Sequence, residues 1–296
     1  MPARNRIVEE IAAAGGWIPF ARYMQLALHE PGIGYYASGA RKFGAGGDFV
    51  TAPELGSLFG RTLARQLRGF ERLPEQVRGA VIANEVVDAT PVHMVHWTAY
   101  GILERGVDAG LAWSDRPATG ELLGAAERIA VPVPYVSEIG LLARAWMRTL
   151  AQSLERGVIF VIDYGFPARE YYHPQRASGT LMCHYQHRAH ADPFARPGDE
   201  DITAHVDFSA LADAARAGGA EVLGFTSQAQ FLVNCGITDV LAQANAENAL
   251  HYAPIASEAQ KLLSPAEMGE LFKVLAVGKG VARLTGFTRG DRRASL

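Results

Sequence analysis

The sequence has few cysteines, few lysines and no long apolar run. Its 296 residues include only two cysteines, Cys183 and Cys235, which cannot form a disulfide framework. No apolar stretch approaches the roughly 18 residues that a membrane-spanning helix needs. Residues 1–17 also lack the continuous apolar core of a secretory signal. We therefore expect a cytoplasmic protein in a reducing setting, with no membrane span.

Neither sign of charge dominates the chain. It has 28 basic and 31 acidic residues, and only four of the basic residues are lysine. The formal net charge of -3 argues against a nucleic-acid partner bound through phosphate neutralisation. The apolar fraction of 49% excludes an intrinsically disordered chain, and a chain of this length can bury a core without disulfides or metal.

The order of apolar patterns predicts an α/β fold. Helical periodicity occurs in four segments, residues 7–14, 20–28, 55–67 and 141–154. Strand patterns occur in four, residues 79–83, 157–162, 221–225 and 272–277, of which the first two are typical of buried parallel strands. Because helix and strand patterns alternate, we expect a sheet with flanking helices.

We expect three regions along the chain. Residues 1–68 hold two N-terminal helices and a glycine-rich lid loop, residues 69–280 form the α/β domain, and residues 281–296 form a mobile tail. Residues 92–113 alternate loosely and contain a glycine-flanked turn near Gly106, which predicts an antiparallel β-hairpin inserted in the α/β domain. We expect this hairpin to serve packing or partner binding rather than chemistry.

A loop of unusual length follows the second helix. Residues 31–48 contain six glycines, and a capping box at residues 51–54 then opens a helix that ends near Leu67. Loops of this length are often functional, so we expect it to close over a ligand as a lid. The glycines at 44–47 resemble a phosphate cradle, but no strand precedes them and no Lys-Ser/Thr pair follows, which favours a simple turn.

Polar residues follow the first two predicted strands. They are Asn84, Glu85, Asp88, Asp163 and Tyr164. Because ligands bind beyond the carboxyl ends of parallel strands, we expect these side chains to share one rim of the sheet. Paired carboxylates at such a rim can hold a guanidinium, bind ribose hydroxyls or take a proton from a nucleophile. The alternative is that the aspartates only cap helices or turns.

Histidines gather between residues 173 and 205. They are His173, His184, His187, His190 and His205, with Cys183 among them. The tract lacks the second ligand cluster or the helical His-Glu-x-x-His pattern of known zinc sites, so we expect no metal. A metallohydrolase would require stoichiometric zinc, and a serine hydrolase has no support because no Gly-x-Ser-x-Gly string is present.

Several strings of the sequence together resemble one protein family. They are Gly34-Tyr-Tyr, Gly47-Asp-Phe-Val-Thr-Ala-Pro-Glu54, Phe59-Gly60, Asn84-Glu-Val-Val-Asp-Ala-Thr-Pro-Val-His93, Ile162-Asp-Tyr-Gly165, Gly179-Thr-Leu and Asp201-Ile-Thr-Ala-His-Val-Asp-Phe208. In this order, and over the chain to about Lys279, they resemble the MidA family of S-adenosylmethionine (SAM)-dependent methyltransferases.

The resemblance implies a class I methyltransferase fold, which is a Rossmann-like sheet with flanking helices, and SAM as cofactor. For the mitochondrial members it implies arginine methylation of a complex I subunit during assembly, and so a protein substrate or assembly partner. On this sequence it predicts cofactor contacts from five residues, Gly47, Asp48, Phe49, Thr51 and Asn84. It also places Asn84 and Glu85 beside the transferred methyl group. The acceptor pocket is then shaped by Asp88, Asp163 and Tyr164.

The sequence departs from the family at one place. Family members carry a glycine-rich cofactor motif, Glu-x-Gly-x-Gly-x-Gly, after the helix that here ends near Leu67. Only 11 residues, Arg68 to Arg78, separate that helix from the next predicted strand. A β-α-β unit needs about 30 residues. We therefore expect a sheet that lacks its first strands and has an exposed edge at residues 80–83.

Two interpretations follow from the resemblance and its departure. The first is a methyltransferase that acts on protein arginine, with a partner chain or a homo-oligomer completing the donor site. The second is a catalytically silent binding or assembly module that keeps the substrate-recognition half, because methyl transfer depends on holding donor and acceptor in near-attack geometry.

Overall fold

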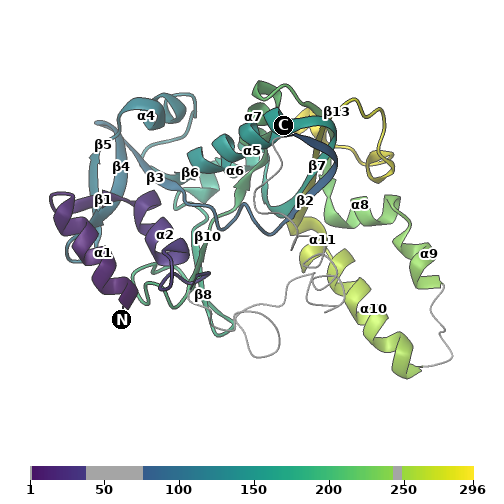
Figure 1. The fold of residues 1–296 in the computed structure, drawn as a ribbon, viewed down its shortest axis with the longest axis horizontal. Coiled ribbons are helices and arrows are strands. Elements are labelled where there is room, and N and C mark those ends of the chain that lie inside the picture. Colours follow the sequence, from purple (N-terminus) through teal and green to yellow (C-terminus); the bar gives the residue numbers. More distant parts are fainter. Residues whose placement is uncertain (1, 38–75, 243–248) are drawn as a thin grey trace. The chain divides into compact units, whose positions relative to one another are not determined.

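The computed structural model describes residues 2–37, 76–242 and 249–296, and Figure 1 labels its elements. The chain divides into two compact units. Within the described ranges, unit 1 contains residues 2–37, Ala89–Leu142 and Tyr172–Ala204. Unit 2 contains the remaining described segments, Gln76–Asp88, Ala143–Tyr171 and those of His205–Leu296. Each unit is therefore assembled from segments that are distant in the sequence.

Unit 1 is built on an antiparallel sheet in which β1, β4, β3 and β6 are neighbours and β5 adds to β4. Its strands are β1 (Trp17–Pro19), β3 (His93–Thr98), β4 (Gly101–Asp108), β5 (Trp113–Pro117) and β6 (Tyr135–Ile139). The antiparallel hairpin expected at 92–113 is present as β3 and β4. Its turn lies at residues 99 and 100, and the turn expected at Gly106–Gly110 instead overlaps the next connection, between β4 and β5.

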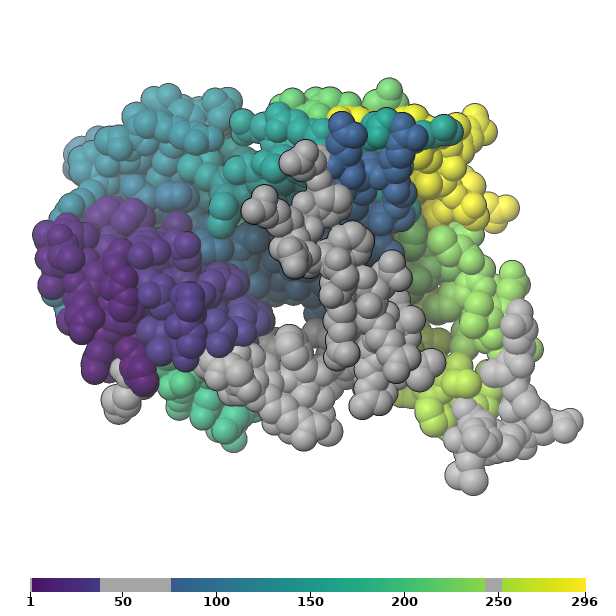
Figure 2. Space-filling model, in the orientation of Figure 1, coloured from purple at the N-terminus to yellow at the C-terminus, as the bar shows by residue number. Residues whose placement is uncertain are grey.

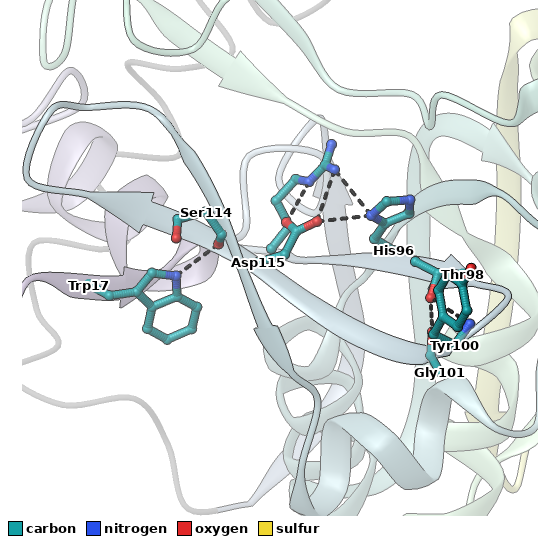
Figure 3. Close-up of polar contacts among 8 residues, drawn as sticks. Trp17, His96, Thr98, Tyr100, Gly101, Ser114 and Asp115 are labelled. Atoms are coloured by element: carbon teal, nitrogen blue, oxygen red, sulfur yellow. Dashed lines mark hydrogen bonds and ion pairs between the residues drawn. The ribbon is translucent and has the colours of Figure 1, made fainter.

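The hairpin turn is held by the side chain of Thr98. As Figure 3 shows, Thr98 Oγ1 donates to the carbonyl oxygen of Gly101 at 2.8 Å and accepts from the N–H of Tyr100 at 3.1 Å. These bonds fix the two-residue turn while the Tyr100 side chain stays fully exposed. Trp17 Nε1 also donates to the carbonyl oxygen of Ser114 at 2.8 Å, which ties β1 to β5.

A small ion cluster lies on the same sheet. Arg105 Nε donates to Asp115 Oδ1 at 2.9 Å, and His96 Nδ1 lies 2.9 Å from Asp115 Oδ2 (Figure 3). The Arg105 guanidinium and His96 hold the pKa of Asp115 below its usual value, against the opposing effect of burial. The cluster joins three adjacent strands, β3, β4 and β5.

Two N-terminal helices cover this sheet, as their apolar periodicity predicts. They are α1 (Pro2–Ala13) and α2 (Phe20–His29), and both contact β1. Ile7 and Ile11 of α1 and Met24 of α2 have no exposed surface and pack in one apolar cluster with Val107 of β4. Burial of one face of each helix against the sheet supplies the hydrophobic stabilisation of unit 1.

A second, three-stranded sheet of unit 1 comes from the histidine-rich stretch. It has the order β10-β8-β9, with β8 (Met182–Tyr185), β9 (Arg188–His190) and β10 (Asp201–Thr203). The short helices of the unit are α4 (Gly120–Ala126) and η2 (Pro174–Arg176). Cys183 is fully buried in the cluster that α1 and α2 also enter, and burial raises the pKa of its thiol.

One buried carboxylate attaches the segment before β8 to β6 of the first sheet. Glu138 on β6 is 1% exposed and accepts from the N–H groups of Thr180 at 2.7 Å and Leu181 at 2.9 Å. Gly179 has φ +77°, and a Cβ at that position would collide with the Glu138 carboxylate. The Gly179-Thr-Leu string is therefore explained by a backbone turn that closes around a buried acid.

Unit 2 is built on a mixed sheet whose longest strand is β7 (Leu154–Phe166). The other strands are β2 (Val77–Asn84), β11 (Val206–Asp207), β12 (Glu221–Ser227) and β13 (Phe272–Lys279). β2 and β11 pair with β7 in parallel, whereas β13 runs antiparallel between β7 and β12. The two parallel strands predicted from residues 79–83 and 157–162 are thus direct neighbours.

Helices cover both faces of this sheet. On one face, α5 (Leu141–Ser153) and α7 (Phe208–Ala217) pack Met147 and Phe208 against Val161 and Leu275. On the other, α8 (Gln228–Asn234) presents Phe231 to a smaller cluster. The remaining helices are α6 (Ala168–Tyr171), α9 (Ile237–Ala242), α10 (Ala249–Leu263), α11 (Met268–Leu271), η3 (Thr285–Phe287) and η4 (Arg293–Ser295).

Two segments of unit 2 differ from expectation. In β2, which the sequence predicts to be buried, Ala83 alone is fully buried and Ile82 is 63% exposed. Residues 281–296, for which we expect a mobile tail, pack against the sheet. Phe287 is 8% exposed, and the N–H of Arg292 donates to the carbonyl oxygen of Phe225 at 2.6 Å. None of the helices within the described ranges combines the length and apolar character that a membrane crossing requires.

We predict that Gly157→Ala destabilises the protein by about 2 kcal/mol or more, because Gly157 has φ +143° and an added Cβ would collide with the backbone oxygen of Gly79 across the β2–β7 pair. Gly124→Ala is the control, since nothing lies within 4 Å of a Cβ there and the residue is helical. We expect that change to stabilise by about 0.5–1 kcal/mol. Urea denaturation measures both, and equal effects would contradict this account of the strand pair.

Candidate active site

The carboxyl end of β2 turns sharply at Glu85. Glu85 has φ +51°, the left-handed conformation that residues with a Cβ rarely adopt, and its N–H donates to the carbonyl oxygen of Ile162 on β7 at 3.0 Å. The Asn84 side-chain amide donates to Glu85 Oε1 at 3.0 Å, and both side chains are half-buried. The strand therefore ends in an amide and a carboxylate held beside each other at the rim.

A fully buried carboxylate at the end of β7 holds the loop that follows. Asp163 Oδ2 accepts from the N–H groups of Val87 at 3.0 Å and Asp88 at 3.3 Å, and Oδ1 accepts from the N–H of Tyr164 at 2.9 Å. Both oxygens of Asp163 are thus used within the fold. Its part is to position residues 85–88 rather than to touch a ligand.

Asp88 and Tyr164, whose backbone N–H groups are held by Asp163, also contact each other through their side chains. The Tyr164 hydroxyl donates to Asp88 Oδ2 at 2.6 Å, and Asp88 is buried. Burial, reinforced by the nearby Asp88 carboxylate, raises the pKa of Asp163 well above its ordinary value, against three backbone N–H groups that act in the other direction. The Tyr164 ring lies edge-on to those of His205 and Phe272, with centroids 5.2 and 5.5 Å away.

The structure thus brings together the five residues that the sequence places at the rim. Asp88, Asp163 and Tyr164 form one hydrogen-bonded group. Asn84 and Glu85, which precede Asp88 in the chain, are hydrogen-bonded to each other. The contacts of Asp163 favour the alternative interpretation, in which this aspartate caps backbone N–H groups of a turn. The other predicted cofactor contacts, Gly47, Asp48, Phe49 and Thr51, lie outside the described residues, as does the lid loop from residue 38 onward.

Sequence reasoning missed a buried lysine near the rim. Lys273 on β13 stands opposite Asp163 in the strand register and is 4% exposed. Its ammonium lies 5.8 Å from the centroid of Phe166 and donates to the carbonyl oxygen of Glu270. Burial lowers the pKa of Lys273. The signal in the sequence is a single lysine inside the apolar string Phe272–Val277, next to a strand end already identified as polar.

The histidine-rich stretch supplies structural contacts. His190 Nε2 lies 3.0 Å from Glu200 Oε2, and His173 Nδ1 accepts from the N–H of Gln175 at 3.2 Å, which caps η2. Burial raises the pKa of Glu200. Within the part of the chain that the structure describes, no three His, Cys, Asp or Glu side chains are arranged to hold a metal ion.

Comparison with known proteins places this arrangement in a family. Residues 59–226, more than half of the chain, match the family model described as "Putative S-adenosyl-L-methionine-dependent methyltransferase". The chain belongs to this methyltransferase family. The resemblance to the MidA methyltransferases is confirmed, as is the α/β, class I methyltransferase-like fold.

A solved structure extends the match over the whole chain. The crystal structure of a "likely methyl transferase" from Burkholderia thailandensis, bound to S-adenosyl-homocysteine, has 42% sequence identity and a TM-score of 0.91. The alignment covers 100% of this chain and 96% of that one. The strand ends described above therefore belong to a fold that holds the demethylated cofactor in that relative.

Two curated relatives carry an activity in their names. The Drosophila melanogaster protein arginine methyltransferase NDUFAF7 homolog, mitochondrial, is 25% identical over 90% of this chain and 82% of its own length. The Danio rerio protein arginine methyltransferase NDUFAF7, mitochondrial, is 24% identical over 89% of this chain and 84% of its own. These names favour a methyltransferase over a catalytically silent module.

The length of the alignment with a relative is consistent with a segment missing from this chain. The match to the Drosophila protein runs over 372 positions although it includes only 90% of a 296-residue chain. That relative therefore carries on the order of a hundred residues, within the matched span, that this methyltransferase-family chain does not have. Such a number is enough for more than one β-α-β unit of about 30 residues.

The rim residues have the chemistry to stabilise a positive charge such as the sulfonium of SAM. The cofactor carries a positive sulfonium, and the end of β2 supplies a carboxylate from Glu85 and an amide from Asn84, both half-buried. Oxygen atoms of this kind stabilise a neighbouring cation more strongly where water is partly excluded. The other residues for which the sequence predicts cofactor contacts lie outside the described ranges.

We predict that Asp163→Ala destabilises the protein by about 3 kcal/mol, since three backbone N–H groups lose their acceptor. A raised pKa means that the folded state binds the proton more tightly, so this residue contributes most at low pH. The contribution falls as the pH rises above the ordinary value of 3.8. The loss should therefore be larger at about pH 5 than at about pH 8.

The matched control for this prediction is Asp213→Ala on α7, where the side chain is 75% exposed and forms an ion pair with the exposed Arg216. We expect that change to shift stability by less than about 0.5 kcal/mol. Thermal and urea denaturation at both pH values measure the effect. A loss for Asp163→Ala that grows with pH would contradict the raised pKa.

Proposed function

We propose that this chain transfers the methyl group of SAM to an arginine side chain of a protein substrate. The family membership supports the cofactor, and the names of the Drosophila and zebrafish relatives support arginine as the acceptor. The observation that carries the proposal is the pair Asn84 and Glu85 at the carboxyl end of β2, beside a loop fixed by a buried aspartate.

Glu85 has the chemistry to bind and orient a guanidinium. A carboxylate accepts two N–H bonds from arginine in a planar, bidentate arrangement. The guanidinium is protonated at any ordinary pH, so the attacking nitrogen must give up a proton as the new N–C bond forms, while the bond from the methyl group to sulfur would break and leave neutral S-adenosyl-homocysteine. Glu85 would accept that proton as general base, and Asn84 would orient the Glu85 carboxylate through its 3.0 Å hydrogen bond.

The acceptor pocket would be completed by Asp88 and Tyr164. Their 2.6 Å hydrogen bond fixes a carboxylate and a ring next to the same strand end, and Asp163 holds the backbone beneath them. When bound, SAM supplies an activated methyl group on a positive sulfur. We assign its contacts to Gly47, Asp48, Phe49 and Thr51 together with Asn84, on the strength of the family resemblance.

We further propose a cytoplasmic location and a protein partner. The two cysteines support a reducing compartment, because both are free thiols and Cys183 is fully buried in an apolar cluster. A protein acceptor is supported by the relatives named as protein arginine methyltransferases.

The proposal predicts that Glu85→Gln lowers kcat for methylation of an arginine peptide by about 100-fold or more, because the amide cannot take the proton. The Kd for S-adenosyl-homocysteine should change far less. The assay follows transfer of a radiolabelled methyl group from SAM to the peptide, with calorimetric titration of S-adenosyl-homocysteine alongside it.

Glu221→Gln provides the control, since Glu221 is an exposed carboxylate at the start of β12 in the same unit. It should leave kcat and cofactor binding unchanged. A Glu85→Gln variant with full activity would contradict the assignment of the base. No saturable binding of S-adenosyl-homocysteine by the folded wild-type protein would contradict the cofactor.

A further inference from the structure

The outer edge of β2 has backbone groups available for pairing. Among the described residues, β2 forms strand hydrogen bonds with β7 alone. The N–H of Glu85 points to β7, where it donates to Ile162, and successive residues of a strand turn their N–H groups to opposite edges. The N–H groups of Ala80, Ile82 and Asn84 therefore point to the other edge.

Between Gly79 and Ala83 this edge lacks the charges and prolines that normally protect edge strands, and the exposed Arg78 and the irregular register at Val77/Arg78 mark its start. From Gly79 to Ala83 the residues are Gly, Ala, Val, Ile and Ala, with no charge and no proline. Its register with β7 is regular from Arg78 to Asn84. Figure 2 shows β2, in dark blue, at the surface of the molecule. An exposed, regular and apolar edge is a template for pairing with another strand.

One face of β2 is more buried than the other, as is also true of β7. Val81 and Ala83 pack into the cluster beneath α5 and α7. Ile82 lies on the opposite face beside Phe160 and Ile162, which are themselves only partly buried. Its exposed fraction of 63% is the second largest among the exposed large aliphatic side chains of the described residues, after Val240 at 65%. An apolar strip thus continues from β7 to the open edge.

We infer that a second copy of this chain pairs with β2 in antiparallel orientation, so that the two sheets become continuous. A two-fold axis that runs perpendicular to the sheet, between one residue of β2 and the same residue of the second copy, places even-numbered residues of one chain opposite even-numbered residues of the other. One such register sets Ala80 opposite Ile82 and Arg78 opposite Asn84. All four have N–H groups that point to the open edge, so the register forms the hydrogen-bonded pairs of an antiparallel ladder.

Side-chain size fits this self-pairing. Each Ile82 faces the small Ala80 of the partner subunit, which leaves room to bury it. The Arg78 side chain at the start of β2 is 72% exposed and forms an ion pair with Glu155 of β7 in its own chain, so its charge remains paired in the dimer. The inference goes beyond the proposed methyl transfer and does not rest on it.

The test measures oligomeric state by sedimentation velocity at about 1 to 100 μM protein, the range in which a micromolar dimer dissociates. The wild type should form a concentration-dependent dimer. Ile82→Lys and, independently, Ala80→Lys place a charge on the edge and should raise the dimer Kd at least about tenfold. Val240→Lys is the matched control, because Val240 is equally exposed but lies on α9, and it should dimerise as the wild type does.

Hydrogen exchange provides a second readout on the same samples. The amide protons of Ala80 and Ile82 should exchange more slowly in the dimer than in the Ile82→Lys and Ala80→Lys variants, with circular dichroism establishing that each variant is folded. A wild type that stays monomeric at about 100 μM would overturn the inference. Dimers that survive both edge variants, or that Val240→Lys disrupts to the same degree, would overturn it as well.

Discussion

The hydrogen bonds of one buried carboxylate determine the geometry of the candidate site. Asp163 ends β7 and accepts from the backbone of Val87, Asp88 and Tyr164, so two chain segments that meet at the rim are held by the same group. Because these N–H groups share one fully buried acceptor, the loop after β2 is held in one arrangement. The left-handed backbone at Glu85 and the contact between Tyr164 and Asp88 both depend on that arrangement.

Unit 1 also contains a buried carboxylate that accepts hydrogen bonds from backbone N–H groups. Glu138, also buried, accepts from the backbone of Thr180 and Leu181 and so attaches an irregular segment to a strand. In both units an acid with little or no exposed surface positions backbone rather than binding a ligand. This distinction separates Asp163 from Glu85, which is half-buried and whose carboxylate stands at the open end of β2.

Local patterns in the sequence predict the regular elements well. The periodicity of Ile7 and Ile11 gives α1, and the apolar run ending in Asp163 gives β7. Features that depend on distant partners could not be predicted in this way. Glu138 is a single acidic residue in a short strand. It accepts hydrogen bonds from a turn some forty residues later in the chain, which no local pattern indicates. The exposure of Ile82 and the packing of Phe287 likewise depend on what lies across the sheet rather than on neighbouring residues.

The position of β13 has a consequence for how the chain folds as it is synthesised. β13 lies between β7 and β12, yet it is the last of the three to leave the ribosome. All segments of unit 1 have been synthesised once residue 204 is made, whereas the central ladder of unit 2 must wait for residues 272–279. Until then β7 and β12 have no antiparallel neighbour. The sheet of unit 2 therefore closes only through pairing between segments far apart in the sequence, the kind of contact that forms slowly.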